Sequence, residues 1–343
     1  MKQLLNTLYI QTQGAYLRLD HETLKVEIEK ELKLQLPLHH LGGVVVFGNV
    51  LISPFLLHRC GADGRAVVWL SEHGRFQGRL SGPTTGNVLL RRSQHLTLNQ
   101  LDSTLDIARY MVAGKLQNAR NVLLRAAREA KTESDRDTLR TAAEIHAKAI
   151  RSAETAKELE KLRGTEGYAA KSYFAAFSAM IRMHRSEFEF KERSKRPPKD
   201  TINALLSFAY TLLANECVAA CEGVGLDPQM GFLHSLRPGR PALALDLMEE
   251  LRPILADRLV LTLINRGQIK PSDFVDRPGG GIHLTDEARR EFLTAYQKRK
   301  QEEVSHAIAQ SKVPFGLLAH VQARLLARHL RGDIPQYPPF ILR

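Results

Sequence analysis

The sequence predicts an α+β protein in which a small N-terminal β domain precedes a larger all-α domain. Two observations lead to this prediction. Short runs of β-forming residues, broken by Gly, Asp and Pro, fill residues 4–94, and after Arg92 the apolar residues recur at three- and four-residue spacing instead. The chain has 343 residues, 43% of them hydrophobic, which is enough to bury a core in each of two domains.

The strands of the first domain, residues 1–94, are expected where β-formers alternate or cluster. These runs are Thr7–Gln11, Ala15–Leu19, Thr23–Glu27 and Gly43–Phe47. Residues 94–100 have no strong pattern and mark the expected linker. The helical domain is then predicted over residues 101–343.

The first helices of that domain are predicted over residues 99–120 and 122–162, where Leu, Ile, Ala and Met recur at helical spacing. A further apolar helical face follows Glu166. Thr165 is the expected N-cap, which would place Glu166 in the first helical turn. An acid there has a simple explanation in the helix dipole, so its position alone does not indicate a ligand.

A mixed-charge segment, Arg182–Asp200, is predicted to be a loop between two helices because of its length and its paired prolines. Its basic residues suggest either a solvated face or a DNA contact, and the candidates for that contact are Arg193, Lys195 and Arg196. The apolar residues 201–221 then predict a helix, with Cys217 and Cys221 in the core.

Residues 231–252 combine a Pro- and Gly-rich loop with a helix. Leu243, Leu247, Met248 and Leu251 recur at helical spacing and predict a buried stripe. The loop carries His234, Arg237 and Arg240, and the helix carries Asp246 and Glu249 on another face. An imidazole and carboxylates brought together by a bend can hold a divalent cation, and the two arginines could hold phosphates beside it. The competing interpretation is a solvated acidic face.

Residues 274–284 predict a hairpin with a Gly-rich turn, followed by a helix from Thr285 to about Glu303. A hairpin beside a helix is typical of a winged DNA-binding module. The segment 334–343, rich in Pro, is expected to be an extended tail that could dock on a partner.

Composition indicates a polyanionic partner. The net charge is +12, and an excess of Lys and Arg attracts phosphate backbones. The longest apolar run, residues 44–57, is interrupted by polar residues, so no membrane span is expected. The N-terminal residues lack a signal-peptide pattern and the three cysteines form no CxxC pair, so we expect a cytoplasmic protein without a disulfide framework or structural zinc.

The loop and helix of residues 231–252 resemble the second half of the active site of the CRISPR-associated integrase, the universal adaptation endonuclease of CRISPR systems. That family has a His in a Gly-Phe-Leu-His turn and then a Leu-Asp-Leu-x-Glu helix, which stand here as His234 and Leu245–Glu249. Its first ligand lies in a Glu-Gly-x-Ala-x-x-x-Tyr stretch, found here as Glu166–Tyr173. The resemblance covers nearly the whole chain and is strongest to members from type I systems.

The resemblance implies that Glu166, His234 and Glu249 are catalytic and bind Mg²⁺ or Mn²⁺, with Asp246 in a second shell or at a second ion. It implies integration of captured DNA fragments into the CRISPR array as new spacers, by attack of a fragment 3′-hydroxyl on a repeat phosphodiester. The family acts on double-stranded DNA as homodimers bridged, in a hetero-hexamer, by a small ferredoxin-like adaptation protein, and an adaptation nuclease often accompanies it. The N-terminal domain would serve dimerisation and partner contact.

Two other functions fit the residues. A stand-alone nuclease that repairs branched DNA would use the same metal site without an array or a partner. A non-catalytic basic scaffold would bind duplex DNA through the wing-like hairpin and the basic loop, with its acids merely solvated. Metal-dependent cleavage separates the scaffold from the two enzymes.

Overall fold

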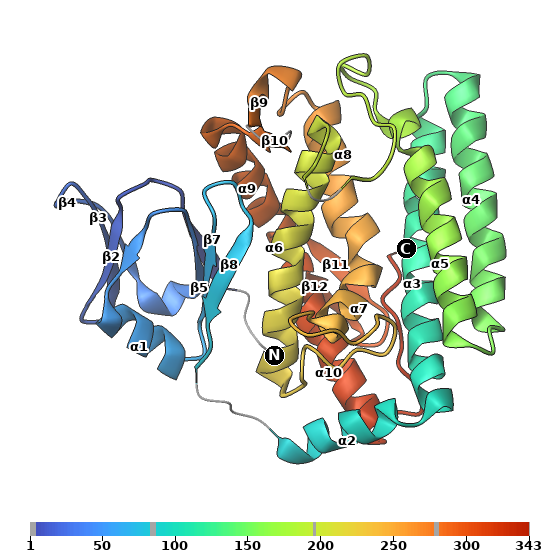
Figure 1. Cartoon of the computed structure of the whole chain (residues 1–343), viewed down its shortest axis with the longest axis horizontal. Coiled ribbons are helices and arrows are strands. Elements are labelled where there is room, and N and C mark those ends of the chain that lie inside the picture. The colour runs from blue at the N-terminus through green and yellow to red at the C-terminus, as the bar shows by residue number, and fades with distance from the viewer. Residues whose placement is uncertain (1–4, 83–86, 195–196, 278–280, 343) are drawn as a thin grey trace. The chain divides into compact units, whose positions relative to one another are not determined.

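The computed structural model describes residues 5–82, 87–194, 197–277 and 281–342 (Figure 1). The chain divides into two compact units, Met1–Thr85 and Gly86–Arg343, which we call the β unit and the helical unit. This confirms an N-terminal β region followed by a mostly helical one.

The described part of the β unit contains two sheets and one α-helix. Its strands are β1 (Asn6–Ile10), β2 (Tyr16–Asp20), β3 (Thr23–Ile28), β4 (Glu31–Pro37), β5 (Leu41–Phe47), β6 (Leu51–Ile52), β7 (Ala66–Leu70) and β8 (Phe76–Leu80). In the sheet ordered β1-β5-β7-β8, the first three strands are parallel and β8 is antiparallel to β7. In the sheet ordered β4-β3-β2-β6, only β6 pairs parallel to its neighbour.

The core of the β unit is built from the alternating apolar residues of these strands, such as Leu17, Leu24 and Val46, which are fully buried. Helix α1 (Pro54–Ala62) covers this core with Leu56 and Cys60. Ser53 caps the helix by accepting a hydrogen bond from the amide of Leu56 at 3.3 Å. The strand runs predicted from the sequence are therefore all present.

In its described residues, the helical unit is a bundle of helices with two small hairpins. Its helices are α2 (Val88–Leu98), α3 (Leu101–Glu129), α4 (Glu133–Glu154), α5 (Leu159–Ala175), α6 (Thr201–Val224), α7 (Ala242–Leu251), α8 (Arg258–Asn265), α9 (Asp286–Gln301) and α10 (Leu318–Leu330). The hairpins are β9 (Phe274–Arg277) with β10 (Gly281–Leu284), and β11 (Glu303–His306) with β12 (Ser311–Pro314).

The boundary between the units lies before the predicted linker. Asn87 accepts hydrogen bonds from the amides of Leu89 (2.9 Å) and Leu90 (3.4 Å), so α2 begins at Val88. The buried side chain of Gln94 then donates to the carbonyls of Asp227 (2.9 Å) and Met230 (2.8 Å). Residues 94–98 are thus helical and belong to the second unit, so the boundary predicted at residues 94–100 was placed too late.

Helix α7 packs against both α3 and α6 in the centre of the unit, and α4 and α5 lie along α3 (Figure 1). The predicted stripe of Leu243, Leu247, Met248 and Leu251 on α7 is buried. After α7 the chain continues as a π-helical segment, Arg252–Asp257, into α8. Pro253 lies at its start and cannot donate to the preceding turn, which explains the change of helical pattern.

Helix α6 is long and apolar enough to cross a membrane by length and composition, although no such segment was expected from the sequence. Of its apolar window, 61% is buried inside the protein, and the helix packs against α7 and α10. Cys217 and Cys221 are both buried there, as predicted. The burial identifies α6 as the core helix of the bundle.

The hairpin predicted at residues 274–284 is confirmed as β9 and β10, and α9 follows it. The predicted turn residues Gly279 and Gly280 lie outside the described residues. The second hairpin, β11 with β12, was not predicted, because residues 303–314 were not assigned to any element.

Residues 334–342, which we call the closing segment, fold back onto the helical unit. Tyr337 and Phe340 are buried, and Asn118 of α3 donates to the carbonyl of Phe340 at 2.8 Å and accepts from the amide of Leu342 at 2.9 Å. The expectation of a tail free to dock on a partner was therefore wrong. Its other polar partners are Glu250 of α7, which accepts from Tyr337 and from the amide of Phe340, and Gln322 of α10, which donates to the carbonyl of Pro338. Asn118 and Glu250 lie far earlier in the chain, beyond the reach of local sequence patterns.

Candidate active site

The loop before α7 is shaped by Gly231 and Asp246. A Cβ atom on Gly231 would stand 2.5 Å from the carbonyl carbon of Ala242 and 2.6 Å from Oδ2 of Asp246, so the loop can pass this close to α7 only at a glycine. The amide of Leu243 is satisfied by the carbonyl of Pro228 at 2.9 Å. The loop therefore packs directly against the first turn of α7 and hydrogen-bonds to it.

Asp246 is fully buried and organises the loop. Its Oδ2 accepts from the amides of Phe232 (2.6 Å) and Leu233 (3.0 Å), and its Oδ1 accepts from the amide of His234 (2.9 Å). The same Oδ1 lies 2.6 Å from Nδ1 of His234. Because a carboxylate only accepts, Nδ1 is the donor, and Nε2 of a neutral imidazole is left with its lone pair.

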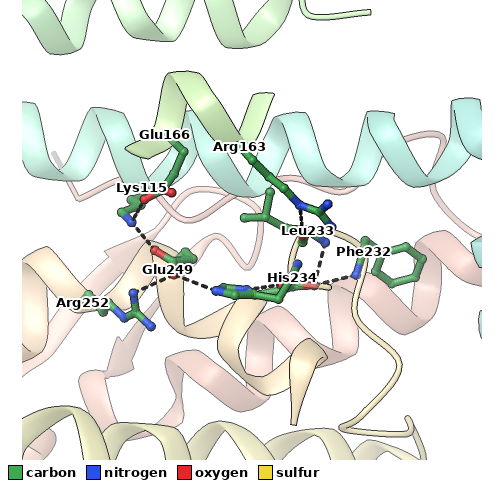
Figure 2. Close-up of polar contacts among 9 residues, drawn as sticks. Lys115, Arg163, Glu166, Phe232, Leu233, His234, Glu249 and Arg252 are labelled. Carbon is green, nitrogen blue, oxygen red and sulfur yellow. Dashed lines mark hydrogen bonds and ion pairs between the residues drawn. The ribbon is translucent and has the colours of Figure 1, made fainter. Parts of the chain in front are cut away.

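Glu249 lies one turn further along α7 and is 2% exposed. Its Oε1 is 3.6 Å from Nε2 of His234 and 2.7 Å from Nη1 of Arg252. Figure 2 shows the imidazole and the carboxylate facing each other, with Arg252 on the far side of Glu249. The interpretation of Asp246 and Glu249 as a solvated face was therefore wrong.

Glu166 comes from α5 and faces the same place. The helix begins at Leu159, and Thr165 lies within it, donating to the carbonyl of Lys161 at 3.0 Å. The prediction that Thr165 caps the helix and that Glu166 lies in its first turn was wrong. Arg163, one turn before Glu166, donates from Nε to the carbonyl of Leu233 at 2.7 Å and so ties α5 to the loop of His234 (Figure 2).

Lys115 of α3 joins the two glutamates. Its Nζ contacts Oε1 of Glu166 and lies 2.5 Å from Oε2 of Glu249 (Figure 2). The side chain of Lys115 is 13% exposed and that of Glu166 is 24% exposed. Two helices and one loop therefore bring Glu166, Glu249 and His234 to one half-buried cluster, and α3 adds Lys115.

The charged groups of this cluster shift one another's pKa values so that the ionised forms are favoured. Burial alone would raise the pKa of Glu249, but Arg252, Lys115 and His234 together lower it to about 2. Burial would likewise lower the pKa of Lys115, and the two glutamates outweigh that effect and raise it. Glu249 is therefore ionised and Lys115 charged at neutral pH.

The donor atoms suit a hard divalent cation. Two carboxylates and one imidazole nitrogen are typical ligands of Mn²⁺ and Mg²⁺, and an imidazole held at Nδ1 by an acid is the usual arrangement of a ligating histidine. Within the described ranges, no group of three or more His, Cys, Asp or Glu side chains is close enough to hold a metal ion as it stands. Lys115 lies between the carboxylates that would have to share the ion.

The basic residues predicted to contact DNA differ in their surroundings. Arg237 is exposed in the loop before α7 and Arg240 is half-buried there. Arg193 instead faces the protein: its guanidinium donates to Asn203 Oδ1 at 2.6 Å and to Ser207 Oγ at 3.1 Å, and it lies over the ring of Tyr210. Its prediction as a free DNA contact therefore conflicts with the structure. Lys195 and Arg196 lie outside the described residues.

Sequence reasoning did not find three members of the cluster, Lys115, Arg163 and Arg252. Lys115 and Arg163 are single basic residues among many on helices with ordinary charge patterns. Arg252 lies three residues after Glu249, a spacing that predicts an ion pair on a helix and could have identified it.

Comparison with known proteins identifies the family. The family described as CRISPR associated protein Cas1 matches residues 8–298. CRISPR-associated endonuclease Cas1 1 of Moorella thermoacetica is 55% identical over 343 residues, and the protein of the same name from Chlorobaculum tepidum is 48% identical, each match covering 100% of both chains. A CRISPR-associated exonuclease Cas4/endonuclease Cas1 fusion of Geobacter sulfurreducens is 41% identical over 98% of this chain and 60% of the fusion.

Solved structures share the fold. A Cas1 protein from Thermotoga maritima matches with a TM-score of 0.81 and 24% identity, covering 98% of this chain and 99% of that one. A casposase bound to integration product matches with a TM-score of 0.84 and 20% identity over 97% and 92% of the two chains. A chain of a Cas6-RT-Cas1–Cas2 complex matches with a TM-score of 0.83 and 24% identity, covering 100% of this chain and 36% of that one. The chain therefore belongs to the Cas1 family of CRISPR-associated proteins, the endonuclease family of its curated relatives.

Proposed function

We propose that this protein is a metal-dependent DNA endonuclease and integrase that inserts captured DNA fragments as new spacers into a CRISPR array. The observation that supports it is the convergence of Glu166, His234 and Glu249, from two helices and a loop, on one half-buried cluster. We assign these three residues as the ligands of Mg²⁺ or Mn²⁺. When bound, the ion would supply charge neutralisation at a phosphodiester and activation of the attacking oxygen.

The residues around the ligands have separate tasks in this proposal. Asp246 holds the imidazole of His234 so that Nε2 points to Glu249, and Arg163 keeps the His234 loop against α5. Arg252 neutralises Glu249 from the side opposite His234. Arg237 and Arg240, beside the ligand loop, would hold DNA phosphates.

The charge of the cluster fits a phosphodiester. Apart from the Glu160–Arg163 ion pair, the site holds the carboxylates of Glu166, Asp246 and Glu249 and the cations of Lys115 and Arg252, which leaves one negative charge when the imidazole of His234 is neutral. A divalent cation adds two positive charges, and with Lys115 displaced from between the glutamates but still beside them the excess is one positive charge, which a single phosphodiester would neutralise. The net charge of +12 over the whole chain would attract the rest of the duplex.

The attacking group in this proposal is a water or a DNA 3′-hydroxyl. The cluster of Glu166, His234 and Glu249 contains no Ser, Cys or Tyr nucleophile, so we expect direct transesterification and no covalent link between protein and DNA. In integration, the 3′-hydroxyl of the fragment would attack the phosphorus of a phosphodiester at the repeat boundary. A new P–O bond forms as the old P–O3′ bond breaks, and the displaced 3′-oxygen leaves as a hydroxyl that takes up the proton lost by the attacking group.

The assembly proposed is a homodimer bridged by the small ferredoxin-like CRISPR adaptation protein in a hetero-hexamer, acting in the cytoplasm on double-stranded DNA. The name of the solved complex that contains both Cas1 and Cas2 supports such a partner, and the Cas4/Cas1 fusion supports an accompanying nuclease. We assign dimerisation and partner contact to the β unit and catalysis to the helical unit.

Replacement of Glu166, His234 or Glu249 by Ala tests the site. Each variant should lose divalent-dependent DNA cleavage by at least about a hundredfold and still unfold cooperatively. Glu144→Ala is the matched control, because Glu144 is an exposed glutamate on the neighbouring helix α4. Cleavage by Glu166→Ala at the wild-type rate would remove Glu166 from the site.

Integration is tested with the partner protein and a supercoiled plasmid that carries a leader and repeat. Fragments with free 3′-hydroxyls should be joined, and fragments ending in a 3′-dideoxynucleotide should bind without being joined. Joining of the blocked fragment would exclude 3′-hydroxyl attack. Cleavage of branched DNA without any joining would favour the repair nuclease, and binding without cleavage would favour the scaffold.

A further inference from the structure

Lys115 holds a position that the proposed function assigns to a metal ion. Its Nζ forms ion pairs with Glu166, on α5, and with Glu249, on α7, and both partners are proposed ligands. Figure 2 shows the ammonium group between the two carboxylates. Lys115 therefore differs from a lysine in a surface ion pair, because it is largely buried and pairs with two acids of the same site.

Glu166 and Glu249 can lie close together in the ionised form only if a cation compensates their negative charges. Glu249 is 2% exposed, and an ionised carboxylate so deeply buried is strongly destabilised unless a positive group compensates it. Arg252 compensates one oxygen of Glu249, at 2.7 Å from Oε1, and Lys115 compensates the other, at 2.5 Å from Oε2. Glu166 has its ion pair with the same ammonium group.

An ammonium group and a metal ion cannot share this position. Mg²⁺ binds carboxylate oxygens at about 2.0–2.1 Å. Nζ of Lys115 lies 2.5 Å from Oε2 of Glu249, so an ion that binds this oxygen between the two glutamates would overlap the ammonium group. Two cations in contact would also repel each other in a site with little water. The absence of a group of three ligands close enough for a metal among the described residues agrees with this arrangement.

We infer that Lys115 is an internal counter-cation that holds Glu166 and Glu249 together in the metal-free protein and must leave for the metal ion to bind. The inference rests on the proposed function, since it takes these glutamates as ligands. Arg252 would stay on Glu249 in both states, because it occupies the other oxygen and also packs on the ring of Tyr210. Lys115 has a flexible chain and can withdraw along α3.

The competition has a measurable cost to metal affinity. If Lys115 fills the position in about nine molecules of ten, the apparent affinity for Mn²⁺ is lowered about tenfold relative to a site without it. Removing the ammonium group should therefore tighten Mn²⁺ binding while it destabilises the metal-free protein.

The experiment compares Lys115→Met with the wild type in Mn²⁺ titrations followed by electron paramagnetic resonance and in thermal unfolding with and without Mn²⁺. Lys115→Met should bind Mn²⁺ about tenfold more tightly and melt at a lower temperature without metal. It should gain more from Mn²⁺ in melting temperature than the wild type does. Lys115→Gln, which keeps a polar side chain without the charge, should show the same direction and serves if the Met variant does not fold.

Lys300→Met is the matched control. Lys300 forms a buried ion pair with Glu216 at 2.6 Å, on α9 and α6, away from the proposed ligands. This variant should melt at a lower temperature and bind Mn²⁺ as the wild type does. It separates the loss of any buried ion pair from the loss of the competing cation.

Two failures can be told apart. If Glu249→Gln binds Mn²⁺ as tightly as the wild type does, the metal site of the proposed function is wrong and the inference falls with it. If Mn²⁺ binding depends on Glu249, but neither Lys115 variant binds Mn²⁺ more tightly than the wild type, the proposed function stands and Lys115 is not a competitor.

Discussion

Asn118 connects the closing segment to the helices of the candidate site, and its removal makes a quantitative test of that connection. The side chain is fully buried on α3, one turn after Lys115. Nδ2 donates to the carbonyls of Glu250 and Phe340, both at 2.8 Å, and Oδ1 accepts from the amide of Leu342 at 2.9 Å. Asn118→Ala leaves three backbone groups without this partner.

The expected cost follows from these three hydrogen bonds. Each contributes about 1 kcal/mol net, and buried groups left unpaired raise the total to about 3–5 kcal/mol. For a unit of this size that corresponds to a fall of roughly 10 °C in melting temperature. Asn121→Ala is the control, because Asn121 lies on the same helix, is half-buried and donates to the carbonyl of Leu342 at 2.7 Å. It should cost about 1 kcal/mol.

The two units can be followed separately in one urea titration. The single tryptophan, Trp69, lies in β7, so its fluorescence reports the β unit, whereas far-ultraviolet circular dichroism reports mainly the helices. Asn118→Ala should lower the dichroism midpoint much more than Asn121→Ala does. A loss of less than about 1 kcal/mol in the dichroism transition of Asn118→Ala would refute the assignment of the closing segment as a structural part of the helical unit.

Two further predictions concern pH and salt. Burial raises the pKa of Asp257 from 3.8 to about 6. The folded protein therefore keeps this proton to higher pH than the unfolded chain does. As a result, the free energy of unfolding falls by on the order of 3 kcal/mol between about pH 4 and pH 6. Asp257→Asn, whose side-chain oxygen can still accept from Tyr210, should not show this fall when urea unfolding is compared at pH 4.5 and pH 7. Equal pH dependence of the wild type and Asp257→Asn would contradict the assignment of the fall to Asp257. Arg237→Ala should lower the slope of log DNA affinity against log salt by about one. Arg193→Ala should leave this slope unchanged and lower the free energy of unfolding. A changed slope for Arg193→Ala would mean that Arg193 does contact DNA.

Local patterns in the sequence were sufficient for much of the fold. The apolar runs of the strands and the stripe of Leu243, Leu247 and Leu251 report burial directly, because strand and helix periods place such residues on one face. The hairpin before α9 followed from its glycines. Asn87 was not recognised as a helix cap, and that single residue accounts for the misplaced boundary between the units.

The candidate site could be predicted only in part, for a physical reason. His234, Asp246 and Glu249 lie close together in the sequence, so a bend and a helix suffice to bring them together, whereas Glu166 was assigned through the family pattern. Lys115 and Arg163 meet the site through helix packing, and no local period encodes which basic residue of a helix will face an acid far along the chain.

The closing segment also constrains the order in which the protein can form during synthesis. Asn118 bonds to residues 222 and 224 positions later, so the packing around α3 stays incomplete until residues 340–342 have been translated and have left the ribosome. The β unit is a compact body formed by Met1–Thr85 alone and can fold while the ribosome is still working. A nascent chain would therefore display a folded β unit well before residues 334–342 could take their place against α3.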